Sequence, residues 1–305
     1  MTDKLDILVK QFTQRYIDVL SEIKGKGLRS YGFEYEFLPT RSLSMHDMTA
    51  VSQLLLETGF SLDGNEYLAD NGFRVAFEPG GQIEYCSPPL LRDDDQLFDS
   101  LLAFIDQSNK TIRDHLDIEY IGTDYMPGRA QAPLCLISNR YVKLHNRLAE
   151  IDTRGLEMMK GTASIHLHVG ISNINEILPL FNFLCKLSTT DEFKMSRERR
   201  DIWNHTDSSR CGRPPCCFAH LESSEELIKR LIHFALNADV LGEDIAFVNS
   251  ADQSFKKFLY HMTTLFTDVR FNLKGPTLEM RTLDSMPLAQ FKIRWKRFVY
   301  LFENM

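Results

Sequence analysis

The stretch Phe77-Glu78-Pro79-Gly80-Gly81-Gln82-Ile83-Glu84-Tyr85 carries two carboxylates on either side of a Pro-Gly-Gly turn. After the turn, polar and apolar residues alternate, so Gln82 and Glu84 are expected on one face of a strand and Ile83 and Tyr85 on the other. Acidic surface turns are common, and the stretch alone is compatible with one. Its interpretation depends on whether other strands have the same design.

Three other stretches alternate ionisable and apolar residues in this way. They read YGFEYEF at residues 31–37, SIHLHV at 164–169 and TLEMR at 277–281. Such alternation usually indicates an antiparallel sheet with one face in water. Faces in water tend to carry Lys, Thr and Ser, whereas these faces carry mostly Glu, His and Arg beside glycines. The pattern therefore favours a site over a plain solvated face.

If the strands are neighbours, their shared face gathers a dense set of ionisable groups: Glu34, Glu36, Glu78, Glu84, Glu279, His166 and His168. Carboxylates at this density cannot all stay ionised without cations. Hard divalent ions, chiefly Mg²⁺ or Mn²⁺, prefer such oxygen ligands, and Arg281 beside them suits a phosphate. The pattern predicts a metal and nucleotide site.

Composition limits the class of protein. The chain has 305 residues, of which 43% are hydrophobic, so it can bury a substantial core. A net charge of −7 and the lack of a basic run argue against a nucleic-acid partner. No run of about 18 apolar residues and no apolar signal segment after Met1 is present, so we expect a cytoplasmic protein without a membrane partner. No repeat or linker interrupts the sequence, which favours a single domain over residues 1–305.

The cysteines allow two interpretations. Six cysteines are too few for a disulfide scaffold, so Cys86, Cys135 and Cys185 are expected to be buried thiols. The other three, with a nearby histidine, have the spacing Cys-x4-Cys-Cys-x2-His: Cys211, Cys216, Cys217 and His220. A zinc site is one interpretation, but no second Cys-x2-Cys pair supports it and adjacent cysteines seldom bind one tetrahedral ion. An ordinary loop is favoured.

Hydrophobic periodicity and turn residues predict the remaining elements. Helices are expected over residues 3–25, ending at Gly25-Lys26-Gly27, and over 45–58, 93–116, 137–151, 175–189, 192–203, 224–237, 254–265 and 288–302. Further strands are expected at 73–77 and 118–123. The polar stretch from Trp203 to Arg213 suits a mobile loop that contacts a ligand.

Taken together, these motifs resemble the plant and proteobacterial glutamate–cysteine ligases. The matching pieces occur in the family's order over roughly residues 30 to 290: YGFEYEF, EPGGQIE at 78–84, GLEMM at 155–159, Arg199 through Trp203, Thr206-Asp207 with Arg210 and Gly212, and LEMR at 278–281. His166-x-His168 departs from the Gln-x-Asn of plant-type enzymes and is closer to bacterial carboxylate–amine ligases and glutamine synthetase. All three groups belong to the glutamine synthetase-like superfamily.

The resemblance implies an α+β fold, in which a curved antiparallel sheet forms an active-site funnel with helices packed outside. It also implies ligation in which ATP phosphorylates a carboxylate, usually that of glutamate, before an amine such as cysteine displaces phosphate. Mg²⁺ ions would be held by Glu34, Glu36, Glu78, Glu84, His166 and Glu279. ATP and its phosphates would be contacted by His168, Trp203, Asp207, Arg210 and Arg281, and catalysis would use Glu84, Arg210 and Arg281. The family also suggests a homodimer.

Two departures leave the amino acceptor open. The chain ends soon after Arg281, where plant-type ligases continue, and Lys160-Gly161-Thr162 has Gly where that family has Arg. Two alternatives therefore stand beside the ligase hypothesis. One is a phosphotransferase of guanido-kinase type, and the other is a non-catalytic homologue that binds nucleotide.

Overall fold

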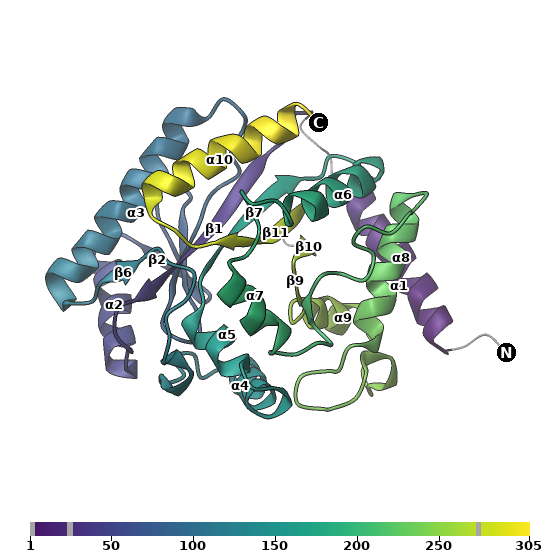
Figure 1. Cartoon of the computed structure of the whole chain (residues 1–305), viewed down its shortest axis with the longest axis horizontal. Coiled ribbons are helices and arrows are strands. Elements are labelled where there is room, and N and C mark those ends of the chain that lie inside the picture. Colours follow the sequence, from purple (N-terminus) through teal and green to yellow (C-terminus); the bar gives the residue numbers. More distant parts are fainter. Residues whose placement is uncertain (1–3, 23–26, 273–275) are drawn as a thin grey trace.

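The computed structural model describes residues 4–22, 27–272 and 276–305. Within these residues, nine strands form one sheet in the order β10-β11-β7-β1-β5-β4-β3-β2, with β6 paired to the end of β1 (Figure 1). The strands are β1 (Tyr31–Pro39), β2 (Ser61–Asp63), β3 (Glu66–Leu68), β4 (Arg74–Phe77), β5 (Ile83–Cys86), β6 (Tyr120–Ile121), β7 (Ser164–Gly170), β10 (Val269–Asn272) and β11 (Thr277–Asp284). The strands β8 (Cys211–Gly212) and β9 (Phe266–Thr267) form a separate parallel pair.

Helices lie around the sheet, and the strands of the nine-stranded sheet pair antiparallel throughout. They are α1 (Lys4–Ser21), α2 (Met45–Glu57), α3 (Asp95–Leu116), α4 (Asn139–Ile151), α5 (Gly155–Gly161), α6 (Ile177–Leu187), α7 (Arg197–Asn204), α8 (Ser224–Asn237), α9 (Phe255–Met262) and α10 (Leu288–Glu303). The fold is α+β, as predicted, and it is compatible with a glutamine synthetase-like architecture.

One face of the central strands is closed by aromatic packing. Phe33 of β1 is buried, and its ring centroid lies 5.1 Å from that of Phe291 and 5.5 Å from that of Trp295. Trp295 stacks on Phe98 of α3, and Figure 1 shows α3 and α10 running next to one another along the sheet. Burial of each such aromatic side chain contributes roughly 1.5–3 kcal/mol to the free energy of unfolding. Because alternate residues point to opposite faces, this packing directs Glu34 to the other side of the sheet.

The Pro-Gly-Gly turn between β4 and β5 is docked on the end of α5. Gln82 is buried, and its Nε2 donates to the carbonyl oxygens of Met159 at 3.3 Å and Thr162 at 3.1 Å. Gly81 has a φ of +83°, which favours glycine, and its N–H donates to Glu78 O at 2.9 Å. The turn thus fixes the backbone that carries Glu78.

Some elements differ from the sequence-based expectations. The helix expected over 192–203 begins only at Arg197, because Ser196 caps it by accepting from Arg199 N at 3.1 Å. The strand expected over 118–123 is limited to β6. The short elements α5, β10 and the β2–β3 hairpin were not expected. Helix α1 ends at Ser21. Residue 3, where the predicted helix begins, and Gly25 and Lys26, where it was expected to end, lie outside the described residues.

No helix in the described part of the chain is both long and apolar enough to cross a membrane. The single domain over residues 1–305 and the homodimer stay predictions.

Candidate active site

The sheet order places the four alternating stretches side by side. Strand β11 pairs with β7, β7 with β1, and β1 with β5, all antiparallel. The register sets the following residues opposite one another: Glu36 and Glu84, Glu34 and His166, and Glu279 and His168. The shared ionisable face expected from the alternation is therefore present in the fold.

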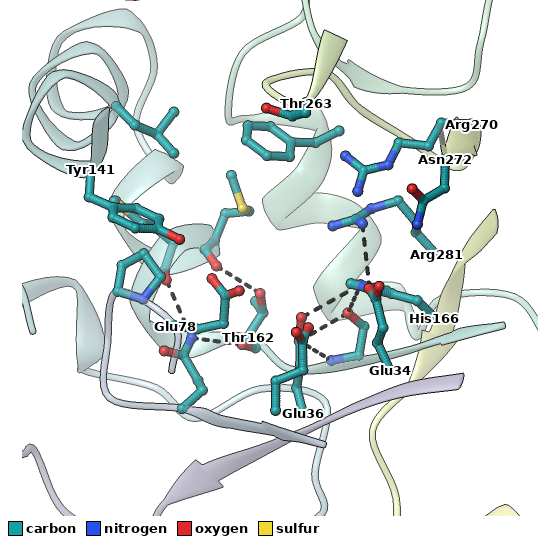
Figure 2. Close-up of a pocket in the computed structure, with 18 of the residues that line it drawn as sticks. Glu34, Glu36, Glu78, Tyr141, Thr162, His166, Thr263, Arg270, Asn272 and Arg281 are labelled. Carbon is teal, nitrogen blue, oxygen red and sulfur yellow. Dashed lines mark hydrogen bonds and ion pairs between the residues drawn. The ribbon is translucent and has the colours of Figure 1, made fainter. Parts of the chain in front are cut away.

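A cavity of about 670 Å³ opens over this face. Its polar side includes Glu34, Glu36, Glu78, Glu84, His166, Arg270 and Arg281, and its apolar side includes Tyr141, Leu144, Met158, Met159, Trp203, Met262 and Phe266. Figure 2 shows Glu34, Glu36 and His166 close together, with Arg270 and Arg281 on one side of them and Glu78 and Tyr141 on the other. Charged groups and a desolvating apolar wall thus share one cavity.

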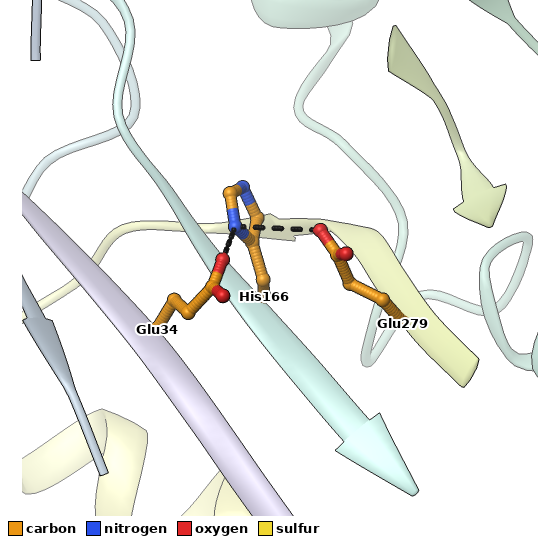
Figure 3. A group of neighbouring side chains, drawn as sticks. All are labelled: Glu34, His166 and Glu279. Carbon is orange, nitrogen blue, oxygen red and sulfur yellow. Dashed lines mark hydrogen bonds and ion pairs between the residues drawn. The ribbon is translucent and has the colours of Figure 1, made fainter. Parts of the chain in front are cut away.

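His166 is the centre of the polar side. Its Nδ1 lies 2.7 Å from Glu34 Oε2 and 3.6 Å from Glu279 Oε1 (Figure 3). Its Nε2 lies 3.5 Å from Glu36 Oε1 and 2.8 Å from Ser164 Oγ. The ring is buried, so each nitrogen is held by groups fixed on neighbouring strands.

Two overlapping groups of side chains could each hold a metal ion. They are Glu34, His166 and Glu279, and Glu36, Glu84 and His166, and in each group the ligand atoms lie within 4.8 Å of one another. Carboxylate oxygens with one imidazole form a donor set that suits Mg²⁺ or Mn²⁺. Glu78 belongs to neither group, although it lines the same cavity.

Crowding of the carboxylates changes their protonation. Burial raises the pKa of Glu84 well above its ordinary value, and the charges of Glu34, Glu78 and Glu36 raise it further. Burial also raises the pKa of Glu78 to about 8, with a further contribution from Glu36. These two acids therefore hold protons near neutral pH unless positive charge is supplied, which is a physical reason for a cation in this cavity.

Glu279 has the opposite electrostatic environment. Burial acts to raise its pKa, but the guanidinium groups of Arg270 and Arg281 outweigh burial and lower the pKa to about 2. Arg270 Nε donates to Glu279 at 2.9 Å from the adjacent strand β10, and Arg281 Nη1 also donates to it. Glu279 is fully buried beneath these arginines and does not line the cavity.

His168 also lies behind the cavity surface. Its Nε2 is 3.5 Å from Glu34 Oε1 and its Nδ1 is 3.0 Å from Thr277 Oγ1. Burial acts to lower its pKa, but the carboxylate of Glu34 outweighs burial and raises it. Burial likewise acts to raise the pKa of Glu34, and His168 and His166 outweigh it, so the Glu34 pKa lies well below its usual range. His168 therefore keeps Glu34 ionised rather than facing the cavity.

Comparison with known proteins shows similarity to glutamate–cysteine ligases of plants. No protein-family model matches the chain. It is similar to glutamate–cysteine ligase A, chloroplastic, of Oryza sativa subsp. japonica, at 22% identity over 270 residues, which is 76% of this chain and 53% of that protein. The chloroplastic glutamate–cysteine ligase of Nicotiana tabacum is 24% identical over 264 residues, and that of Arabidopsis thaliana is 23% identical over 266 residues, each match covering 74% of this chain and 47% of the relative.

The chain is similar in sequence to chloroplastic glutamate–cysteine ligases of plants. It spans about half the length of the curated relatives it matches. Those relatives are chloroplastic by name, so the cytoplasmic location of this chain stays a prediction.

Arg210 and Asp207 were expected to contact the nucleotide; they lie away from the cavity in the structure, and that contact stays a prediction. Arg210 is fully buried and donates to Asp207 Oδ2 at 2.8 Å, to Thr264 Oγ1 at 3.0 Å and to Asp239 O at 2.7 Å. Asp207 also accepts from Arg147 Nε at 2.6 Å. Neither residue lines the cavity, because this internal network uses their polar atoms.

The segment from Trp203 to Arg213, expected to be a mobile loop that contacts a ligand, is held to the rest of the fold by these hydrogen bonds of Asp207 and Arg210. Trp203, at its start, does line the cavity, and its Nε1 donates to Phe266 O at 3.2 Å. The cysteines of the zinc alternative and His220 do not form a group with three ligand atoms within 4.8 Å among the described residues. Cys86, Cys135 and Cys185 are free and buried, as predicted.

Several cavity residues were not singled out from the sequence. Arg270 lies on β10, directly opposite Glu279, and its alternation with apolar neighbours in VRFN is a weak signal over so short a strand. Arg140 and Tyr141, at the start of α4, line the apolar side. Ser164 donates to Glu36 Oε2 through its N–H at 2.6 Å and through its hydroxyl at 3.0 Å, which orients that carboxylate.

Proposed function

We propose that the protein is an ATP- and Mg²⁺-dependent carboxylate–amine ligase, with formation of a γ-glutamyl amide bond as its leading reaction. The observation that carries the proposal is the cluster of carboxylates around His166, with Arg281 beside it, inside one cavity. Phosphoryl transfer depends mainly on positioning and on neutralisation of charge, which such a cluster suits when it holds divalent cations. The chain's relationship to glutamate–cysteine ligases agrees with this reaction.

The donor groups fit Mg²⁺ or Mn²⁺, because two sets of carboxylates and imidazole already converge and because Glu84 and Glu78 have raised pKa values. Glu34, His166 and Glu279 would form one set and Glu36, Glu84 and His166 the other, with Glu78 at the cavity wall. Bound divalent cations would supply neutralisation of the ATP phosphates and of the substrate carboxylate. Among these carboxylates, Glu84 forms no ion pair with another side chain of the described residues, so replacing it should weaken binding of the cation without breaking an ion pair.

The proposed reaction has two displacements. An oxygen of the substrate carboxylate attacks the γ-phosphorus of ATP, and ADP leaves with the electron pair of the broken P–O bond. The amine nitrogen then attacks the acyl carbon, phosphate leaves, and the nitrogen gives up a proton. Arg281, fixed by Glu279, would bind the transferred phosphoryl group, and no side-chain nucleophile is needed. In this scheme Arg210 and Asp207 support the segment that carries Trp203 rather than contacting ATP.

The test is release of ADP and phosphate in the presence of MgCl₂, ATP and glutamate, with and without cysteine, followed by mass spectrometry of the product. Glu84→Gln and Arg281→Ala should lower turnover by about 100-fold or more. Glu243→Gln and Arg92→Ala, at exposed positions, are the matched controls and should keep wild-type turnover. Full activity of both site variants would contradict the proposed site.

The same measurement separates the alternative functions. A stable phosphorylated product without phosphate release would indicate a phosphotransferase. Binding of ATP and Mg²⁺ without turnover on any carboxylate and amine pair would indicate a non-catalytic homologue. Turnover with glutamate that cysteine does not stimulate would keep the ligase class and assign a different amine.

A further inference from the structure

The two groups of possible metal ligands in the cavity share one imidazole. His166 belongs to both, with Glu34 and Glu279 in one group and with Glu36 and Glu84 in the other. A neutral imidazole has one nitrogen that carries a hydrogen and one whose lone pair is open to a metal ion, so the ring serves only one ion at a time. The hydrogen bond that holds the first nitrogen therefore decides which ion the second nitrogen binds.

Ser164 holds one of these two nitrogens. Its Oγ lies 2.8 Å from His166 Nε2, closer than Glu36 Oε1, which is 3.5 Å from the same atom. The hydroxyl donates its one hydrogen to Glu36 Oε2 at 3.0 Å, so its oxygen is left to accept from Nε2–H. Ser164 is 5% exposed and lies two residues before His166 on β7, so the two side chains share a face of the strand and are held together in the interior.

The other nitrogen of His166 faces the first group. Its Nδ1 lies 2.7 Å from Glu34 Oε2 and 3.6 Å from Glu279 Oε1, on the two strands that flank β7 (Figure 3). Arg281 Nη1, which can only donate, is 3.4 Å from Nδ1 and suits a nitrogen with an open lone pair. A cation at Nδ1 would keep both carboxylates as neighbours, whereas a cation at Nε2 would have to displace the Ser164 hydroxyl.

We propose that Ser164 is a positioning residue, whose hydroxyl holds Nε2–H of His166 and thereby assigns Nδ1 to the cation beside Glu34 and Glu279. The second group, on β1 and β5, is then left with carboxylate oxygens alone. This inference rests on the proposed function, because it states which atoms would hold the divalent cations of that cavity. Loss of the Ser164 hydroxyl should therefore weaken binding of the ion that has a nitrogen ligand.

The chain offers variants that isolate the hydroxyl. Ser164→Ala keeps the backbone N–H that donates to Glu36 Oε2 at 2.6 Å, so that carboxylate stays oriented when the hydroxyl is removed. Ser164→Thr restores a hydroxyl on a β-branched side chain, which suits a strand. Ser188→Ala is the matched control, because the buried Ser188 hydroxyl donates to Cys185 O at 2.7 Å and does not line the cavity.

The first measurement identifies the nitrogen that carries the hydrogen. Protein with nitrogen-15 labelled histidine is saturated with MgCl₂, and the His166 signals are assigned by their absence in His166→Gln. Two-bond proton–nitrogen correlation spectra distinguish the two tautomers of the ring. Wild type should show the Nε2–H tautomer, and Ser164→Ala should show a shift towards the Nδ1–H tautomer. The Nδ1–H tautomer in wild type would overturn the proposal, even if Ser164→Ala failed to fold.

The second measurement is the affinity for the cation. Calorimetric titration with MgCl₂ or MnCl₂ should show that Ser164→Ala binds one ion about 10- to 100-fold more weakly than wild type, which is the usual effect of removing the hydrogen-bond partner of a metal-binding histidine. Ser164→Thr should recover most of the affinity, and Ser188→Ala should bind as wild type does. Equal affinities for wild type and Ser164→Ala would refute the proposal. Equal losses in the Ala and Thr variants would also refute it, because they would show an effect of packing and not of the hydroxyl.

These results are separate from the result of the ligase assay. If wild type binds no divalent cation, the proposal and the metal dependence of the proposed function are both wrong. Cation binding that depends on the Ser164 hydroxyl, without turnover of any carboxylate and amine pair, would leave the proposal standing and refute the ligase reaction. Turnover with Mg²⁺ in a protein whose cation affinity does not change in Ser164→Ala would keep the ligase reaction and refute the proposal.

Discussion

Gly80, in the turn that carries Glu78, provides a direct test of how the site is supported. A Cβ at this position would lie 2.5 Å from Lys160 O and 2.6 Å from Lys160 Cα, both backbone atoms of α5. It would also lie 2.8 Å from Gln82 Oε1. Backbone atoms cannot rotate away, so Gly80→Ala must separate the turn from α5 by roughly 1 Å to reach ordinary contact.

The energetic effect follows from what this separation breaks. Overpacking of this kind costs about 1–3 kcal/mol. The hydrogen bonds from Gln82 to Met159 O and Thr162 O lengthen as the turn moves, and each contributes about 0.5–1.5 kcal/mol. Together these terms amount to about 2–6 kcal/mol, which should lower the unfolding midpoint by roughly 4–12 °C, at about 2 °C per kcal/mol for a domain of this size.

Gly32 supplies a matched control within the same sheet. A Cβ there would lie 3.5 Å from Ser87 Oγ and 3.7 Å from His168 Cβ, which are ordinary contacts, so Gly32→Ala should unfold within about 2 °C of wild type. Calorimetric unfolding and titration with MgCl₂ or MnCl₂ measure both effects. Gly80→Ala should also bind the cation more weakly, because Glu78 moves with the turn. Equal midpoints and equal cation affinities for the two variants would refute the claim that the turn is wedged against α5.

Three further predictions concern burial and charge. Burial lowers the pKa of His261 from 6.5 to about 4, so the neutral form is kept in the fold. The contribution of neutral His261 to the free energy of unfolding is complete above about pH 6.5, and it decreases by up to about 3 kcal/mol as the pH falls towards 4. His261→Gln should remove this part of the pH dependence of the unfolding free energy. An unchanged pH profile in that variant would contradict the prediction. Arg199→Met should lower the unfolding free energy by about 3–5 kcal/mol, because it removes the partner of the partly buried Asp284 carboxylate and the hydrogen bonds of a fully buried guanidinium. The exposed control Arg197→Met should change it little in the same denaturant titration. Glu84→Gln should raise the unfolding midpoint of the metal-free protein at alkaline pH, where repulsion among the carboxylates is greatest, and should reduce the stabilisation of the protein by Mg²⁺. The control Glu243→Gln should change neither quantity. A Glu84→Gln variant that is less stable than wild type at pH 9 would show that Glu84 is not under such repulsion.

Alternation in the sequence was sufficient to predict which side chains share a face. In a strand the period is fixed at two, so Glu34 and Glu36 had to lie on one side once Phe33 and Tyr35 were assigned to the core. Pairing of β1 with β7 was a condition of the predicted shared face, because strands so far apart in the sequence are brought together only by the fold. The face that a side chain takes within its own strand is a local property, and a single sequence contains it.

The placement of Arg210 depends on contacts that no local pattern contains. Its partners come from three separate parts of the chain: Asp207 nearby, Asp239 after α8, and Thr264 after α9. An arginine in a polar loop has the same local sequence whether it faces a ligand or an internal carboxylate. Arg270 shows the converse case, because only the register of β10 with β11 brings it to Glu279.

The two halves of the carboxylate cluster differ in how their charge is neutralised. Near β11, Glu279 is held between Arg270 and Arg281, so the protein itself supplies the compensating charge. Near β5, Glu36 and Glu84 stand opposite one another, and no Lys or Arg side chain of the described residues forms an ion pair with either. The strands cannot move apart to relieve this repulsion, because the sheet hydrogen bonds and the aromatic packing on the other face hold them in register. The half near β5 therefore has the stronger need for added cations, and protonation of Glu84 is the response open to it when none is bound.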